Sequence, residues 1–220
     1  MRKITKGTEP ASLTAWKRAN PNGRYDNLTE TERQDIRDAC VKEQFGLCAY
    51  CCKPISGDNS DTMNEHVQAR DEAPQRSLDF TNIVASCTTP NQCDAAHGSQ
   101  AFSLTPLMAE CETELEFMSS GRVKGKTERA QEAIKVLNLG DHETNNKKLI
   151  GARRKVIHDL LWKEGINPEE KLELEDDDLL RDLLRDFQID NINKYSTPQN
   201  GRLEQYSPVL VNFLKGWLPT

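Results

Sequence analysis

The stretch that decides the fold begins with Cys48-Ala49-Tyr50-Cys51 and ends at a second cysteine pair, Cys87 and Cys93. Two cysteines separated by two residues can both ligate one tetrahedral Zn²⁺ from a single tight turn. The second pair is separated by five residues, so its loop must bulge outward for both sulfurs to reach the same ion. The sequence therefore predicts a structural zinc site formed by Cys48, Cys51, Cys87 and Cys93.

The cysteine count favours metal binding over a disulfide framework, because seven is an odd number and we expect a reducing cytosol. Cys52 could replace Cys51 as a ligand, and only the spacing favours Cys51. The competing interpretation is four unrelated reduced cysteines. Cys40 and Cys111 are predicted to be small buried apolar residues. A shell closed by four sulfurs leaves no position for water, so metal-assisted chemistry would need a second ion.

Composition predicts a modest hydrophobic core. Only 36% of the 220 residues are hydrophobic and 29% are charged, so a structural metal would supply part of the stability. The N-terminal residues lack the apolar run of a signal peptide, and no segment approaches the roughly 20 apolar residues of a membrane span. We expect a soluble, cytoplasmic protein.

The formal charge of −6 is unevenly distributed. Residues 168–190 contain ten acidic and three basic side chains, a net charge of −7, so the other residues together carry +1. The acidic run is interpreted as a solvated helix face and linker, with a partner-binding patch as the alternative. Basic residues gather near positions 2–6, 17–18 and 147–155. Such weak overall attraction for a polyanion suggests that a partner supplies part of any nucleic-acid-binding surface.

Local patterns predict an α+β fold. Thr29 and Glu32 have the spacing of a capping box, which predicts a helix over about residues 29–43. Glu65 and His66 should lie on a strand, and a short helix should follow Cys93. From position 127 apolar residues recur at helical spacing, with Gly140 as the expected stop. We expect an N-terminal arm and helix over 1–44, a site domain over 45–120 and a mostly helical region over 121–220.

These motifs resemble the zinc-containing HNH endonuclease family. The resemblance covers about residues 45–100 and is carried by the two cysteine pairs, Glu65-His66 and Asn82-Ile83. The segments at 78–82, 133–139 and 207–210 are similar to the HNH subunit (PtuB) of Septu and retron-associated anti-phage systems. The resemblance implies a small ββα-metal core with a structural zinc knuckle, surrounded by helices.

The resemblance also implies a role for each residue of the site. His66 would be the general base that takes a proton from the attacking water. Glu65 would bind one catalytic Mg²⁺ or a similar divalent cation, and Asn82 would orient the loop beside His66. Asp94 is our preferred further ligand of that cation, with His97 as a phosphate contact or alternative ligand and Asn91 as a further candidate. Because neighbours on a regular strand point to opposite faces, we expect a twist or bulge at Glu65-His66.

The implied function is a metal-dependent HNH endonuclease that hydrolyses phosphodiester bonds of DNA or RNA, as the effector of an anti-phage complex. The implied partners are the nucleic acid substrate, an ABC/SMC-like ATPase of the PtuA type and, in retron systems, a reverse transcriptase with its RNA-linked DNA. The alternatives are a non-catalytic zinc-binding adaptor and a stand-alone toxin nuclease. The motifs do not distinguish DNA from RNA, because their chemistry acts on the phosphate.

Overall fold

The computed structural model describes residues 1–142, 144–163, 165–168 and 178–217. These residues form an α+β fold, which confirms the predicted class. The helices are α1 (Ala11–Ala19), α2 (Glu30–Glu43), α3 (Asp94–His97), α4 (Glu128–Val136), α5 (Lys147–Lys163), α6 (Asp178–Ser196) and α7 (Ser207–Trp217). The strands β1 (Thr62–His66) and β2 (Ile83–Cys87) form one antiparallel sheet, and β3 (Leu115–Phe117) and β4 (Val123–Gly125) form another.

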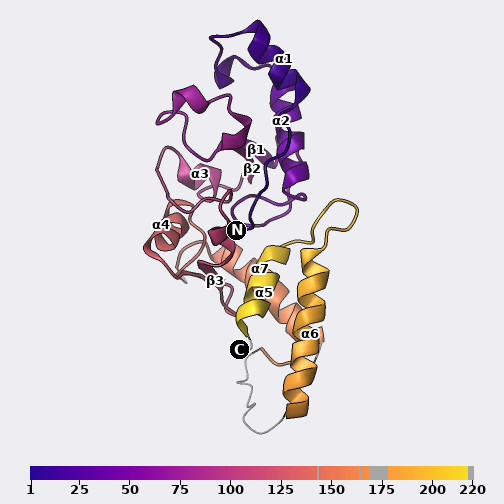
Figure 1. The fold of residues 1–220 in the computed structure, drawn as a ribbon. Coiled ribbons are helices and arrows are strands. Elements are labelled where there is room, and N and C mark those ends of the chain that lie inside the picture. The colour runs from indigo at the N-terminus through magenta and orange to yellow at the C-terminus, as the bar shows by residue number, and fades with distance from the viewer. Residues whose placement is uncertain (143, 164, 169–177, 218–220) are drawn as a thin grey trace.

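The elements follow one another along the length of the molecule (Figure 1). The helices α1 and α2 lie at one end, the β1–β2 pair lies beside α2, and α5, α6 and α7 lie at the other end. Helix α7 packs against α5, α6 and β3. One cluster of buried apolar residues includes members from the N-terminal arm, the cysteine-rich segment and the C-terminal helices. The predicted domain boundaries stay a prediction.

Helix α2 begins at the predicted capping box. The Thr29 amide donates to the Glu32 carboxylate at 2.9 Å, and the reciprocal side-chain cap is also present. The helix buries Ile36, Cys40 and Val41 on one face, as expected for an amphipathic helix against a core. It ends at Glu43, so the chain enters the first cysteine turn directly from a helix packed on both β1 and β2.

Strands β1 and β2 pair one to one, from Thr62 opposite Cys87 to His66 opposite Ile83. The pairing leaves no bulge at Glu65-His66, so that form of the expected irregularity was wrong, and the alternative of a local twist stays a prediction. All five residues of β2 are buried. Because β2 starts just after Asn82 and ends at Cys87, a fully buried strand connects the predicted catalytic motif to the cysteine cluster.

Helix α4 ends before the glycine that was expected to stop it. Asn138 adopts a positive φ of 48°, and the next amide, that of Leu139, donates to the Ile134 carbonyl at 2.9 Å. This is the hydrogen-bond pattern of a Schellman motif with asparagine in the left-handed position. The freed Leu137 carbonyl accepts the Cys93 amide at 3.0 Å, so the end of α4 supports the second cysteine pair.

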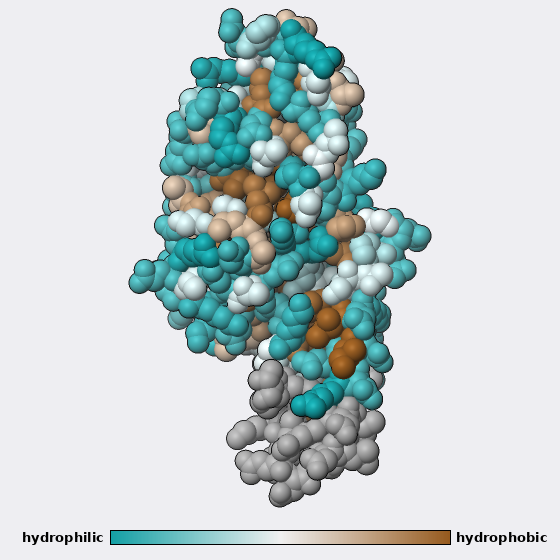
Figure 2. Space-filling model, viewed as in Figure 1, coloured by the Kyte–Doolittle hydropathy of each residue, from teal (hydrophilic) through white to brown (hydrophobic). Residues whose placement is uncertain are grey.

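The face of the molecule shown in Figure 2 is mainly hydrophilic, with hydrophobic side chains exposed in restricted patches. Trp162 and Ile189 are each 55% exposed. None of the described helices combines the length and the hydropathy needed to cross a bilayer. The acidic run expected to form a solvated helix face falls largely on residues 169–177, outside the described residues.

Buried Gln44 connects α2 to the sheet and to the first cysteine turn. Its amide donates to the Leu47 and Ala85 carbonyls, both at 2.8 Å, and accepts the Ala85 amide at 2.7 Å. Gln44→Met should lower the free energy of unfolding by about 2–4 kcal/mol, since buried backbone groups would lose their partners. Urea denaturation of the metal-loaded protein measures this loss. Exposed Gln131→Met is the control, and equal midpoints for the two variants would contradict the prediction.

Candidate functional site

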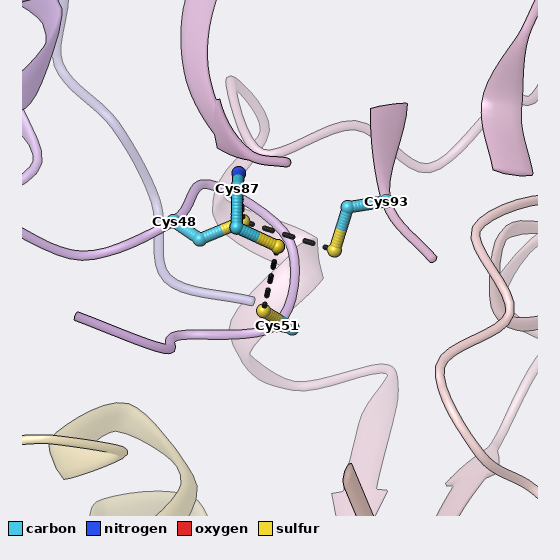
Figure 3. Close-up of side chains that lie close together, drawn as sticks. All are labelled: Cys48, Cys51, Cys87 and Cys93. Carbon is cyan, nitrogen blue, oxygen red and sulfur yellow. Dashed lines mark hydrogen bonds between the residues drawn. The ribbon is translucent and has the colours of Figure 1, made fainter. Parts of the chain in front are cut away.

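Four buried cysteines converge on one point, as Figure 3 shows. Their sulfurs all lie within 4.8 Å of one another. The Cys48 and Cys93 sulfurs are 3.7 Å apart, and those of Cys51 and Cys87 are 3.8 Å apart. A tetrahedral zinc with Zn–S bonds of about 2.3 Å separates its sulfurs by about 3.8 Å. These residues could therefore hold a metal ion such as zinc.

The backbone around each pair explains the convergence. In the first turn, the Cys52 amide donates to the Cys48 carbonyl at 3.1 Å, and Cys52 has a positive φ of 64°. The structure therefore brings Cys51, and not Cys52, into the cluster. In the second pair, Asn91 and Cys93 have positive φ angles of 55° and 54°. These two left-handed residues let the longer loop return to the same point.

Cys40 and Cys111 are buried outside the cluster, as expected of small apolar residues. The four clustered thiols cannot all ionise together without a cation. Hydrogen bonds from the other three thiols, that of Cys48 first, lower the pKa of Cys87. Burial instead raises the pKa of Cys93. A bound cation would remove this conflict, because each thiolate would then face a positive charge.

A fully buried arginine lies in the electrostatic field of the cluster. Burial lowers the pKa of Arg153, and the charges of Cys51 and Cys52 raise it. Its Nη1 donates to the Leu139 carbonyl at 2.6 Å, and its guanidinium lies 4.8 Å from the centroid of the Phe117 ring. Four thiolates around a divalent ion leave a net charge of −2, so a buried cation beside them offsets part of that charge.

A cleft of about 610 Å³ lies beside β1. Its walls come from the N-terminal arm and α2, from β1 with the loop after it, and from α3. The lining side chains that matter chemically are Tyr25, Asp26, Glu30, Arg33, Arg37, Glu65, His66, Arg70, Asp71 and Asp94. Four consecutive residues of β1 line the cleft, so it follows the edge and end of this strand. Glu65 and His66 can therefore share the cleft without a bulge.

His66 is fixed in one orientation. Its Nε2 lies 2.9 Å from the Ser77 carbonyl, which can only accept, so Nε2 carries the proton and Nδ1 keeps its lone pair. The Tyr25 ring packs edge-on against the imidazole at 4.8 Å between centroids. Burial lowers the pKa of His66. The ring is therefore a neutral imidazole with one nitrogen available to accept a proton.

The Glu65 carboxyl group is also buried, and two side chains contact one of its oxygens. The Tyr50 hydroxyl donates to its Oε1 at 3.2 Å, and His97 Nδ1 lies 2.5 Å from the same oxygen. Burial raises the pKa of Glu65. His97 is only 1% exposed, packs against Phe102 and does not line the cleft. The expectation that His97 contacts phosphate does not fit this position behind Glu65.

Asp94 is half-buried and lines the cleft. Burial raises its pKa to about 8, and the neighbouring Glu65 carboxylate adds to the rise. Two adjacent acids that resist ionising together are suited to a hard divalent cation, which carboxylate oxygens prefer to bind. Glu65 and Asp94 therefore fit the donor set predicted for the second metal.

Asn82 and Asn91 occupy different environments. Asn82 is buried, accepts the Gln68 amide at 2.9 Å and donates to the Gln68 carbonyl at 3.0 Å, so it orders the chain just after His66. Asn91 is exposed in the loop between Cys87 and Cys93, and its carbonyl accepts a hydrogen bond from Asn138. The structure does not bring Asn91 to the cleft.

Several residues of the cleft were not identified from the sequence. Tyr25, Arg33 and Arg70 lie near His66 although no motif spacing relates them to it. Comparison with known proteins gave no matching family model and no match among curated proteins. The resemblance to the HNH family therefore rests on the two cysteine pairs, Glu65-His66 and Asn82-Ile83.

The ligand assignment predicts different outcomes for two adjacent cysteines. The unmodified chain should contain about one zinc per molecule, and Cys51→Ser should lose most of it and unfold at a lower temperature. The loss is expected to be severe because structural zinc contributes on the order of 10 kcal/mol to folding. Cys52→Ser is the matched control and should retain the metal. Elemental analysis with thermal melting decides this, and the reverse pattern would reject Cys51 as a ligand.

Proposed function

We propose that this chain is a metal-dependent endonuclease that hydrolyses phosphodiester bonds of nucleic acid. One observation carries the proposal: a neutral imidazole with a free Nδ1 shares a solvent-accessible cleft with two adjacent carboxylates. Hydrolysis of a phosphodiester needs a base for the attacking water and a positive charge at the phosphate. The order of motifs, which resembles the HNH family, supports the same activity.

In this proposal His66 Nδ1 takes the proton from the attacking water. General-base catalysis contributes about 10²- to 10⁴-fold when the base is well positioned. The Ser77 carbonyl fixes the tautomer from the other side of the ring. Asn82 acts as a positioning residue, since it ties down the backbone of Gln68 two residues beyond the base.

Glu65 and Asp94 would hold the catalytic divalent cation, Mg²⁺ or a similar ion. When bound, such an ion offsets the negative charge that builds on the phosphate and on the leaving oxygen. Tyr50, and His97 with its proton on Nδ1, would stabilise the ionised form of Glu65 from the side away from the cleft. The cysteine cluster would have a purely structural role. Because a zinc with four sulfur ligands has no open position, it would support the fold and take no part in the reaction.

The biological setting belongs to the same proposal and rests on the resemblance alone. The segments similar to PtuB support a cytoplasmic anti-phage effector that works with an ABC/SMC-like ATPase and, in retron systems, with a reverse transcriptase and its RNA-linked DNA. The acidic overall charge supports control by such partners, since a free chain with a formal charge of −6 attracts polyanions weakly.

His66→Ala should reduce cleavage of DNA or RNA by at least about 100-fold, because no other group replaces the base. Cleavage in Mg²⁺ should be measured with the chain alone and with the products of its neighbouring genes. Exposed His142→Ala, which lies outside the cleft, is the control. Undiminished cutting by His66→Ala would remove this residue from the mechanism. Absence of cutting by the unmodified chain under all conditions would favour the zinc-binding adaptor.

His97→Leu should raise the Mg²⁺ concentration needed for half-maximal cleavage by about 10- to 100-fold, as expected when a partner of a ligating carboxylate is lost. Activity at saturating Mg²⁺ should largely return, since His97 does not line the cleft. His97→Gln can keep a hydrogen bond to Glu65 and should behave more like the unmodified chain. A Mg²⁺ titration of cleavage rate tests this, and an unchanged requirement in His97→Leu contradicts it.

A further inference from the structure

The cleft that contains His66 also contains three arginines. Arg33 and Arg37 are one helical turn apart on α2, and Arg70 follows β1. Arg37 is 6% exposed and contacts Glu30 and Gln34, so it is committed to α2 itself. Arg33 and Arg70 are more accessible, and their surroundings indicate a role in substrate binding.

Tyr25 holds these two arginines beside the predicted base. The Arg33 and Arg70 guanidinium carbons lie 5.5 Å and 5.2 Å from the centroid of the Tyr25 ring. The same ring packs against His66, and its hydroxyl accepts a hydrogen bond from Asn64 at 2.9 Å. Because arginines and His66 already surround the ring, Tyr25 is poorly placed to stack on a base. The arrangement therefore favours recognition of phosphate over recognition of sequence.

Both arginine side chains form polar contacts with Asp26. Arg70 forms an ion pair with the Asp26 carboxylate, and Arg33 Nη2 donates to the Asp26 carbonyl at 3.1 Å. The two side chains of the ion pair are 42% and 76% exposed, and exposed pairs contribute little to stability. Arg33 is half-buried and Arg70 is exposed, and each guanidinium carries more N–H groups than these contacts use. The two groups therefore retain donor capacity that a phosphate could use.

We propose that Arg33 and Arg70, supported by Tyr25, bind a backbone phosphate next to the scissile one, and that Asp26 occupies them until a nucleic acid strand displaces it. This inference rests on the proposed nuclease function and deepens it. It assigns sequence-independent backbone binding to Arg33 on α2 and to Arg70 in the loop after β1. Tyr25 and Arg33 lie outside the segment that carries the HNH resemblance.

The first test measures binding of a fluorescent oligonucleotide to the full chain carrying His66→Ala, which should slow cutting in Mg²⁺ by at least about 100-fold. In that chain Arg33→Ala with Arg70→Ala should weaken binding by roughly tenfold or more, and the slope of log affinity against log salt should become shallower by about 1–2. Arg154→Ala with Lys155→Ala also removes two positive charges, from exposed positions of α5 outside the cleft, and should change both quantities little.

A second variant separates this effect from misfolding. Asp26→Asn should tighten binding severalfold because it removes the competing carboxylate, and a damaged fold cannot produce that gain. The gain should disappear when Arg70→Ala is also present. Weaker or unchanged binding in Asp26→Asn, or an unchanged salt slope in the double arginine variant, would overturn the inference.

The two hypotheses fail in different ways. If the unmodified chain cuts nucleic acid while the double arginine variant binds and cuts equally well, the arginine assignment alone is wrong. The same holds if the His66→Ala chain binds no oligonucleotide although the unmodified chain cuts it. If the unmodified chain never cuts, with or without its neighbours, the proposed nuclease function is wrong.

Discussion

The rest of the structure depends on one constraint, that four buried cysteine sulfurs must converge around a single metal position. Such a cluster is unfavourable as four thiolates and favourable around a cation, so the proposed zinc would supply binding energy that a modest apolar core does not. The cluster joins the turn at residues 48–51, the end of β2 and the start of α3. The Leu137 carbonyl brings in the end of α4 through the Cys93 amide. Segments from both halves of the chain therefore meet at one point.

The cluster also positions the cleft, because its members directly adjoin cleft residues. Asp94 follows Cys93 and opens α3, so fixing one sulfur fixes the start of the helix that contributes a carboxylate. Strand β2 links the cysteine cluster to the chain beside Asn82, because Cys87 is its last residue. Its five residues span about 16 Å, from Cys87 back to the residue after Asn82. Because every residue of this strand is buried, movement at one end would disturb packing along its whole length.

The sequence was most informative where a short-range rule acts. The capping box of α2 and the C-x2-C turn depend on neighbours within a few residues, and both were predicted. Helix α4 was expected to end at Gly140, but asparagine tolerates the same left-handed backbone, and Asn138 comes first. Whether an individual charged side chain is buried or exposed was harder to predict. Arg153 belongs to a basic cluster in the sequence, yet it is fully buried, so that cluster presents less surface charge than its composition suggests.

The cleft was only partly predictable, because some of its residues come from segments distant in sequence. His66, Glu65 and Asp94 lie near the cysteine ligands, and their spacing identified them as candidates. Tyr25 and Arg33 reach the cleft because α2 packs on β1, a tertiary contact that no local pattern encodes. His97 shows that nearness in sequence does not ensure a place in the cleft. It lies three residues after Asp94, but α3 has only four residues, and His97 turns toward Phe102 in the interior.

One physical cause, burial, has opposite effects on the groups that the proposed chemistry needs. Burial lowers the pKa of His66, which keeps the imidazole neutral and able to accept a proton. Burial also raises the pKa of Glu65 and Asp94, which opposes the ionised state that a cation requires. The hydrogen bonds with Asp94 and, to a smaller extent, with Tyr50 lower the pKa of Glu65 and so partly offset this effect. The raised pKa of Asp94 means that ionising both carboxylates is unfavourable near neutral pH, and the proposed cation would offset this cost. In the proposed nuclease, such a cleft would hold a neutral base and would complete its negative charge when the metal binds.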